Sequence, residues 1–371
     1  MINCTQTLID KLKSGRFKTN CKIEILDSNE NLIEEITNYI IEGSISVDKD
    51  RDIRRNFTLT LDNPNNKFTP GENNLVWLDK RIRIYIGVNL SGNTWEYIPQ
   101  GVFVFNSPKA TSKPGLRQVV LNGTDKMGSW KKITTVLTIE AGVDIPTAIR
   151  AVLNGVETNF NFDDCTEVTP YSLTYQPGTE VKKIVKELAD FITWDIAYNV
   201  YGELRFKPHP SNINQVASVW TYQAENYTLY AGSEKTIDDS ELFNHIFVIG
   251  ASSQNATVSA EALDEDPNSA TSIPVIGDRL YLYNNGTADS LITTVELAQA
   301  RADYELRKRM QYIEKQSIDM VSNFLHEEGD VITLVDSYTE TDDKYELLKF
   351  DIPLKIDMMT AEAWKVRSSI T

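Results

Sequence analysis

The sequence predicts a mainly β fold into which a small α+β module is inserted, and three observations lead to this prediction. Apolar and polar residues alternate in short runs between about residues 20 and 130, which is typical of half-buried antiparallel strands. Helical periodicity is confined to the middle of the chain and to residues 295–310. Alternating runs return near the end. Several short strands at this spacing favour a sandwich or a barrel.

The strands of the first part of the chain follow one another between explicit turns. In residues 21–26, Ile23 and Ile25 share one face, and in residues 81–86 three isoleucines do the same. Asn, Pro, Gly and Ser gather between the runs, as they do in turns. The predicted strands cover residues 21–26, 57–61, 81–86, 102–105 and 118–121, and the turns cover residues 62–71, 91–93 and 112–115.

Two helices are predicted in the middle of the chain. Asp144 is placed to cap a helix over residues 145–153, with Gly155 just past its end. A second helix is predicted over residues 180–192, with Thr179 as its N-cap and one apolar stripe along its length. These helices favour a separate α+β module.

The next part alternates between strands and one helix. A hairpin is predicted over residues 194–206 and a strand over residues 241–250. Residues 251–290 are polar and are expected to form a long surface or contact loop. A helix follows over residues 295–310, for which Thr293 and Glu296 form a capping box.

The chain ends in predicted strands over residues 331–335 and 350–358. Alternation continues without a break through the second of them. Pro353 lies within this run, and because proline has no N–H to donate, it favours an edge position. An edge strand is also a candidate for pairing between subunits.

Composition and charge exclude several classes of protein. A length of 371 residues favours two to three domains. No run of 18 apolar residues and no signal-peptide pattern is present, so we expect folding in a cytoplasm. Cys4, Cys21 and Cys165 are too few and too widely spaced for a disulfide framework or a zinc site. The net charge of −16 argues against strong binding to nucleic acid, and its commonest role is to keep a protein in solution.

No residue pattern predicts a catalytic, cofactor or metal site. His209, His245 and His326 belong to no metal or catalytic motif, and each is expected to be structural. Residues 62–66 resemble an oxygen-ligand loop but lack the glycine and glutamate of an EF-hand. The adjacent acid pairs at residues 163–164, 238–239, 327–328 and 342–343 and the acidic run 261–266 are expected in solvated turns, and the six tryptophans in the core.

Five stretches follow one another in a specific order and spacing. They are RRNFTLTLDNPNNKFTPG from residue 54, residues 83–105 ending in YIPQGVFVF, VKKIVKELADFITWDIAYNVYGELRFKP from residue 181, LFNHIFVIG from residue 242, and residues 297–334 ending in EEGDVITL. In this order and spacing, which extend from about residue 20 to 335, the chain resembles the hub proteins at the base of phage tails and of prophage and tailocin baseplates.

The resemblance implies a non-enzymatic virion protein, made in the host cytoplasm and without cofactors. The sequence departs from the longer members of that family by ending at Thr371 without an appended peptidoglycan-hydrolase domain, which argues against a lytic role. It implies a homotrimeric baseplate hub that joins a sixfold tail tube to a threefold spike. Each subunit would supply two tube-like antiparallel β-barrel domains and a small α+β peripheral module. The implied division is residues 1–130 with strands returning at 203–240, residues 131–202 as the module, residues 241–350 with the helix 295–310, and residues 351–371 as a C-terminal strand and tail.

The same resemblance implies which proteins the chain would contact. They are the tail tube or distal tail protein, the spike or tail-tip protein and the tape-measure protein, with genome DNA passing through the channel without specific binding. A channel wall with net negative charge would repel the duplex, so Arg81 and Arg83 are expected to point elsewhere or to be paired. Two alternatives stay open: a tail-associated peptidoglycan or polysaccharide hydrolase, and a distal tail or receptor-binding component.

Overall fold

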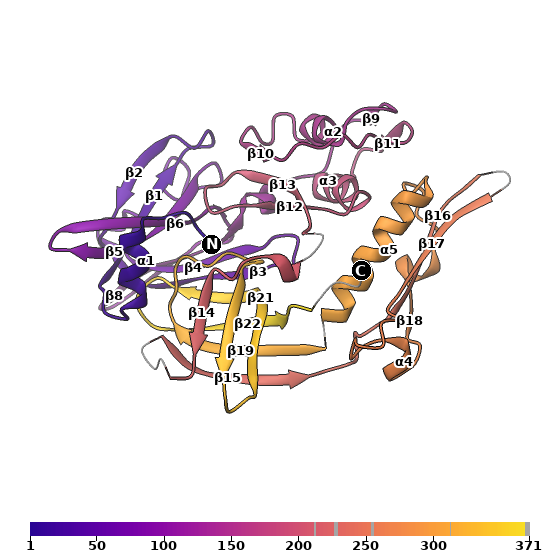
Figure 1. Cartoon of the computed structure of the whole chain (residues 1–371). Coiled ribbons are helices and arrows are strands. Elements are labelled where there is room, and N and C mark those ends of the chain that lie inside the picture. The colour runs from indigo at the N-terminus through magenta and orange to yellow at the C-terminus, as the bar shows by residue number, and fades with distance from the viewer. Residues whose placement is uncertain (211–212, 226–228, 254–255, 312, 368–371) are drawn as a thin grey trace.

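The computed structural model describes residues 1–210, 213–225, 229–253, 256–311 and 313–367. Figure 1 shows three parts: a large β body, a small α/β module above it, and helix α5 packed against a narrow sheet on the right. The fold is mainly β with α+β elements, as the sequence predicts.

The first half of the β body is built from the predicted alternating runs. In β5, Ile82, Ile84 and Ile86 are fully buried, and in β4 Phe57 and Leu59 face the same core. The elements of this half are α1 Gln6–Lys13, β1 Thr19–Leu26, β2 Leu32–Ile36, β3 Ile40–Asp48, β4 Arg55–Asp62, η1 Pro64–Asn66, β5 Arg81–Ser91, β6 Thr94–Phe105, β7 Lys109–Lys113, β8 Leu116–Asp125 and η2 Lys126–Ser129.

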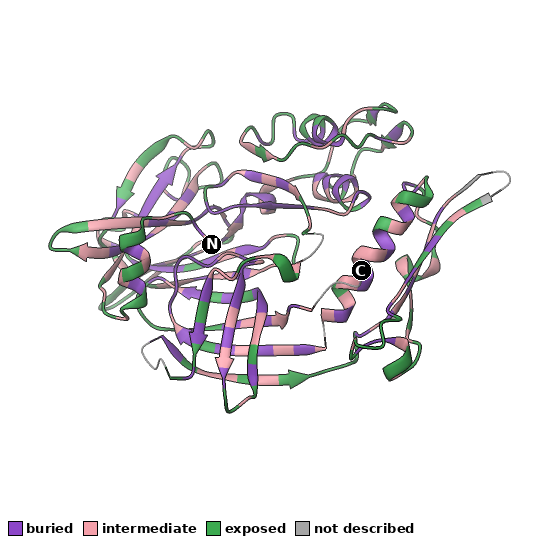
Figure 2. Ribbon diagram, in the orientation of Figure 1, coloured by how far each residue is buried: buried purple, intermediate pink, exposed green. Residues whose placement is uncertain are grey.

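The second half of the β body comes from the end of the chain and from a segment before the α5 part. Its elements are η3 Ile213–Gln215, β14 Trp220–Gln223, β15 Tyr230–Ile237, β19 Glu314–Val321, β20 Val331–Asp336, β21 Thr341–Pro353 and β22 Met358–Lys365. Strand β21 pairs antiparallel with β3, so both halves form one 14-stranded sheet around one core (Figure 2).

The main sheet is open among the strands that the structure describes. Its path runs β15-β19-β22-β21-β3-β4-β8-β6-β5-β1-β2, with β14, β20 and β7 attached beside it. No pairing joins the two ends of this path within the described residues, so the closed barrels that we expected are not found. Alternation specifies which face of a strand is buried but not whether a sheet closes.

The strands predicted to return to the first β domain at residues 203–240 pair elsewhere. Strand β13 (Leu204–Pro208) pairs with β12 (Trp194–Tyr198) and β10 (Phe160–Phe162) of the module, while β14 pairs with β20 and β15 with β19. The prediction of their partners was wrong, because the periodicity of one strand does not identify a partner far away in the sequence.

The predicted strand over residues 350–358 is two strands. β21 ends at Pro353 and β22 begins at Met358, after a turn. Pro353 lies opposite Ser44 of β3 in the interior of the sheet rather than at an edge. As the last residue of its strand, proline is tolerated there, since the ladder does not continue beyond it.

The α/β module contains helices α2 and α3 and, among the described residues, two short sheets, β10-β13-β12 and β11-β9. Asp144 caps α2 as predicted by accepting a hydrogen bond from the backbone N–H of Thr147. The N-cap of α3 is Glu180 rather than Thr179, whose hydroxyl donates to the carbonyl of Gln176. The elements are β9 Leu137–Ile139, α2 Ile145–Val152, β10 Phe160–Phe162, β11 Leu173–Tyr175, α3 Val181–Asp190, β12 Trp194–Tyr198 and β13.

The third part contains most of the segment that we expected to be a loop. α5 (Val295–Gln311) covers a sheet of β16 (His245–Ser253), β17 (Ala256–Leu263) and β18 (Leu280–Leu282), with α4 (Ile273–Ile276) and η4 (Tyr283–Gly286) in its connections. Residues 254–255 lie outside the described residues.

The loop prediction was wrong for residues 256–263 and 280–282, which form β17 and β18, whereas most of residues 264–290 lie exposed or half-buried as expected. A few polar residues of this part nevertheless satisfy one another inside the fold. Asp264 is fully buried, and its carboxylate accepts hydrogen bonds from Ser269 and Thr271. The N-cap of α5 is Thr294, one residue later than predicted, and its hydroxyl accepts from the backbone N–H of Leu297. No helix in the described part of the chain is both long and apolar enough to cross a bilayer.

Candidate functional site

The three histidines lie apart, each in its own polar or aromatic environment. His326 is fully buried, with its Nε2 2.8 Å from the hydroxyl of Tyr222 and its Nδ1 3.4 Å from Asp330. The Nδ1 of His245 lies 3.0 Å from Asp278. His209 stacks on Tyr304 with the ring centroids 4.7 Å apart. The structure brings none of these three beside another.

Burial disfavours the charged form of a histidine and so lowers its pKa, and His209 shows this effect. Burial lowers its pKa to about 4, and Lys49, Arg54 and Lys308 act in the same direction against Asp195. The ordinary pKa of a histidine is about 6.5, so below this pH His209 becomes protonated in the unfolded chain while it stays neutral in the folded chain. Falling pH therefore favours the unfolded state through this window.

His209→Phe is expected to remove this pH dependence while keeping a ring on Tyr304. Between pH 6.5 and pH 4 the wild-type protein should lose about 1–2 kcal/mol of stability relative to the variant, less than the full shift because the ring is only partly buried. Urea unfolding at several pH values measures this difference. Parallel curves for the two proteins would contradict it.

The other sequence candidates divide between surface and interior. Most of the acid pairs are exposed or half-buried as expected, but Glu328 and Asp264 are buried. Of the six tryptophans, Trp220 is buried as expected, whereas Trp77 is exposed. The segment at residues 62–66 forms a strand connection in which Asn63 accepts from the backbone N–H of Phe68. Among the described residues, no group of three or more His, Cys, Asp or Glu is arranged to hold a metal ion.

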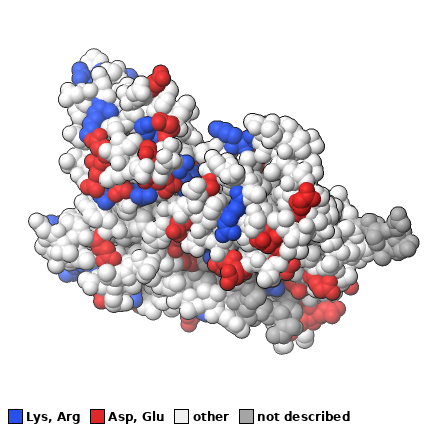
Figure 3. Space-filling view, turned by 90° about the horizontal axis from the view of Figure 1, so that it is seen from above, with Lys and Arg blue, Asp and Glu red and all other residues white. Residues whose placement is uncertain are grey.

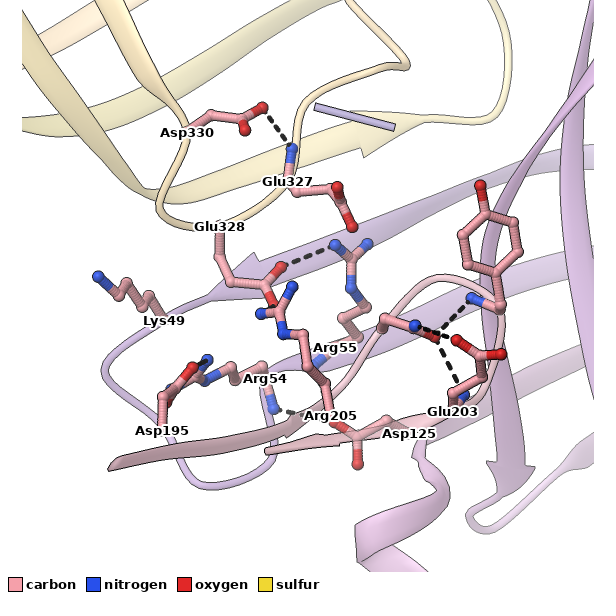
Figure 4. A network of polar contacts seen from close by, with 12 residues as sticks. Lys49, Arg54, Arg55, Asp125, Asp195, Glu203, Arg205, Glu327, Glu328 and Asp330 are labelled. Carbon is pink, nitrogen blue, oxygen red and sulfur yellow. Dashed lines mark hydrogen bonds and ion pairs between the residues drawn. The ribbon is translucent and has the colours of Figure 1, made fainter. Parts of the chain in front are cut away.

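The most concentrated polar site is a buried ionic network, which we call the ionic junction (Figure 4). Arg54 and Arg55 lie at the start of β4. The guanidinium of Arg54 donates to both carboxylate oxygens of Asp195 on β12, at 2.9 and 2.5 Å. The guanidinium of Arg55 donates to Glu328, in the loop before β20, at 2.7 Å. Two adjacent residues thus join β4 to the module and to the second half of the β body.

The backbone around these arginines is held by Asp125 at the end of β8. Its Oδ2 accepts from the backbone N–H groups of Arg54 and Arg55, and its Oδ1 accepts from that of Met127. Burial raises the pKa of Asp125 to about 6, against the lowering effect of these donors. The carboxylate therefore positions both arginines before their side chains diverge.

A second buried cation extends the ionic junction into the module. Lys126 is 1% exposed, and its ammonium lies 2.5 Å from Glu30 and 2.8 Å from Glu157. The hydroxyl of Tyr198 donates to the same Glu157 at 2.6 Å. The first half of the β body and the module are thereby joined through a desolvated charge.

The arginines hold their carboxylate partners in the ionised form. Burial alone would raise the pKa of Asp195 and of Glu328, but the neighbouring guanidinium groups outweigh it and hold both pKa values below their ordinary range. Carboxylates engaged in this way are poor general bases, since their oxygens already accept hydrogen bonds from cations. The ionic junction is built to orient parts of the fold.

Sequence reasoning missed the ionic junction, although one signal was available. Arg55 falls in phase with Phe57, Leu59 and Leu61, the buried face of β4. An arginine on a core face needs an acid partner. That this partner is Glu328, 273 residues away, follows only from the fold.

Comparison with known proteins shows the fold. No family model matches the chain, and no curated protein matches its sequence. A tail protein from Neisseria meningitidis MC58 superposes with a TM-score of 0.63 at 11% identity, covering 93% of this chain and 96% of that one.

Two prophage proteins superpose over similar lengths. The 43 kDa tail protein of prophage MuSo2 from Shewanella oneidensis has a TM-score of 0.60 at 9% identity, covering 93% and 98% of the two chains. Prophage tail protein gp18 from Listeria monocytogenes EGD-e has a TM-score of 0.58 at 10% identity, covering 95% of each. The chain thus has the fold of phage tail proteins, and the predicted resemblance is confirmed at that level.

Proposed function

We propose that this protein is a structural subunit of a phage or prophage tail, and that it forms the trimeric hub between the tail tube and the spike. The observation that carries the proposal is the similarity of almost the whole chain to three tail proteins, with little of either chain left over. Fold similarity by itself does not determine function. The architecture adds an independent argument, which concerns how copies of the chain would join.

The ends of the main sheet supply surfaces for assembly. The path of the described strands ends in β2 and in β15, and each carries exposed apolar side chains. Leu32 and Ile33 on β2 are 57% and 45% exposed, and Ile237 on β15 is 61% exposed. Unpaired edges that carry apolar residues are suited to pairing with another chain.

Pairing of β2 in one subunit with β15 in the next is a head-to-tail contact. Such a contact closes into a ring if the rotation between subunits fits a whole number of copies. In this proposal three copies close the ring, and the ionic junction keeps the two halves of each subunit in the orientation that closure needs. The edge predicted at residues 350–358 has no part in it, because β21 is an interior strand.

The proposed ring would touch the tail tube or distal tail protein on one side and the spike or tail-tip protein on the other, with the tape-measure protein and then DNA in its channel. Arg81 pairs with Glu30, and Arg83 with Glu24 and Glu30, as expected of basic residues in such a protein. The face in Figure 3 shows basic and acidic side chains interleaved, without a large basic patch. An acidic channel wall stays part of the proposal.

The stoichiometry in assembled tails tests the hub proposal. We expect three copies per tail in a reconstruction of the particle, and the substitution Ile33→Lys should prevent their incorporation, because it places a charge on the joining edge. Val136→Lys, at an exposed site before β9 in the α/β module, is the matched control and should assemble normally.

Other outcomes would favour the alternatives. Six copies per tail would indicate a distal tail ring and contradict the hub. Clearing of cell walls in a zymogram by the purified chain would indicate a hydrolase. No contact in the ionic junction favours either alternative.

A further inference from the structure

A chamber lies where the three parts of the molecule meet. Its volume is about 360 Å³, within the range of small-molecule sites. The β body, the module and α5 each supply a wall, and Figure 1 shows these parts converging beside α5. We call it the junction chamber; its lining includes Lys49, Asp190, Trp194, Arg301, Tyr304 and Lys308.

The charge of the junction chamber is opposite to that of the chain. Seven basic and five acidic side chains line it, whereas the whole chain has 37 basic and 53 acidic residues. Three of the five acids, Asp195, Glu305 and Glu346, are already paired with basic residues. Arg307 and Lys308 form no ion pair with any described residue. Arg51 and Lys186 are paired with Asp48 and Asp52 outside the lining, whereas the lining acids Asp50 and Asp190 form no ion pair with any described residue. The two unpaired basic residues of the lining are thus matched in number by two unpaired acids.

Arg301 on α5 is the buried cation in this wall. It is 4% exposed and lies over the rings of Tyr283 and Tyr304, at 5.0 and 5.7 Å from their centroids. Its Nη1 lies 3.6 Å from Glu305, too far for a hydrogen bond. Its Nε and Nη2 are buried and make no hydrogen bond of normal geometry to a described residue, although the hydroxyl of Tyr283 lies close enough to interact with the guanidinium. Leaving buried charged donors unsatisfied is costly.

The two unsatisfied atoms share one edge of the guanidinium. Nε–H and Nη2–H point in the same direction, with the spacing of two oxygens of a carboxylate or a phosphate. The Nε of Arg54, another residue of the lining, is also buried without an acceptor in the described chain. Two guanidinium groups that line one chamber thus each retain donor capacity.

We propose that the junction chamber binds a compact oxyanion, a phosphate or carboxylate group, with the Nε and Nη2 of Arg301 as its principal donors. Arg307 and Lys308 attract the anion to the opening. Since both donor atoms are screened from solvent, the ring of Tyr283 or Tyr304 shifts as the anion enters, as side chains at binding sites commonly do. Asp190, on the same lining, opposes the anion by charge. This proposal does not depend on the proposed hub.

Calorimetric titration of the full chain at low ionic strength tests the proposal. Inorganic phosphate is one probe, and a short acetylated peptide with two glutamates is the other. We expect binding to change the tryptophan fluorescence as well, because Trp194 and Trp364 line the junction chamber. Tighter binding of phosphate would assign a free ion, and tighter binding of the peptide would assign a carboxylate carried by a partner protein.

Two substitutions are expected to change the affinity for the anion in opposite directions, which makes the test specific for the junction chamber. Arg301→Met should weaken binding by about tenfold, the loss of charge-assisted hydrogen bonds. Asp190→Asn should strengthen it. Arg279→Met is the control: Arg279 pairs with Asp239 at 2.7 Å on the surface and does not line the junction chamber, so binding should stay within about twofold.

A further variant keeps the test valid if the Arg301→Met variant fails to fold. The double substitution of Arg307 and Lys308 by alanine touches no described ion pair and should fold normally while weakening binding severalfold. Failure of both probes to bind to the wild-type chain would overturn the proposal. So would wild-type affinity in a folded Arg301→Met variant.

Discussion

Replacing Glu328 with glutamine is expected to lower the free energy of unfolding by about 3–5 kcal/mol. The side chain is 2% exposed and faces Arg55, with Arg205 also 3.6 Å away. Glutamine has nearly the same shape but no charge, so Arg55 would remain buried without its counterion. Most of the loss comes from that unpaired cation rather than from one hydrogen bond. Urea unfolding followed by tryptophan fluorescence measures it.

A surface pair provides the matched control for this measurement. Glu362 lies 2.8 Å from Lys315, but both side chains are about one-third exposed. Glu362→Gln should therefore cost less than about 1 kcal/mol. Replacing Arg55 and Glu328 together by methionine should cost less than the sum of the single changes, because neither residue then leaves the other as a buried lone charge and only Arg205 loses its contact with Glu328. Additive costs would show that the two residues are not coupled.

Replacing Lys126 with methionine is expected to loosen the α/β module from the β body, at a cost of about 3–5 kcal/mol. The ammonium is desolvated between Glu30 and Glu157, and it lies 5.0 Å above the ring of Tyr198. Without it, the buried Glu157 carboxylate loses its counterion and keeps only neutral donors. Hydrogen exchange should quicken in α2, α3 and β12 before it does in β4 and β5.

A compensating change separates charge from packing in this variant. Adding Glu157→Gln to Lys126→Met should restore part of the stability, since it neutralises the carboxylate that the first change left unpaired. Lys182→Met is the control: Lys182 pairs with Asp52 at 3.3 Å on the surface and should matter little. If the double variant is no more stable than Lys126→Met alone, the loss comes from packing rather than from charge.

The two predictions concern one property of the molecule. The ionic junction joins three parts of the chain through charges that are costly to bury unpaired, so any arrangement that separates the pairs is disfavoured. Buried ion pairs add little net stability compared with apolar packing, but they penalise wrong orientations strongly. In the ring that we propose, a fixed internal geometry would help each subunit to match its neighbours.

The elements of this fold were largely predictable, and their connections were not. Alternation located β1, β4, β5 and the hairpin of β12 and β13, and helical periodicity located α2, α3 and α5. Each of these signals depends on which face of a local element is buried, and that is visible within about ten residues. The predicted resemblance to tail proteins agrees with the fold found by comparison.

Wrong predictions arose where distant residues decide the outcome. Uninterrupted alternation across residues 350–358 concealed a turn, because the residues after Pro353 continue the pattern by chance into β22. The polarity of residues 251–290 predicted a loop, but Asp264 is satisfied by Ser269 and Thr271 inside the fold. A polar residue is excluded from the interior only if it lacks a partner there.

The sequence by itself determined the mainly β composition, most of the strands and helices, and the absence of any local catalytic or metal motif. The tertiary structure alone decided that β21 joins the two halves through β3, that Arg55 meets Glu328, and that Arg301 borders a chamber. The physical reason is the separation along the sequence of the residues that interact. Secondary structure follows from periodicity over neighbouring residues, whereas two residues 273 positions apart can form an ion pair only when the whole chain has folded and brought them together.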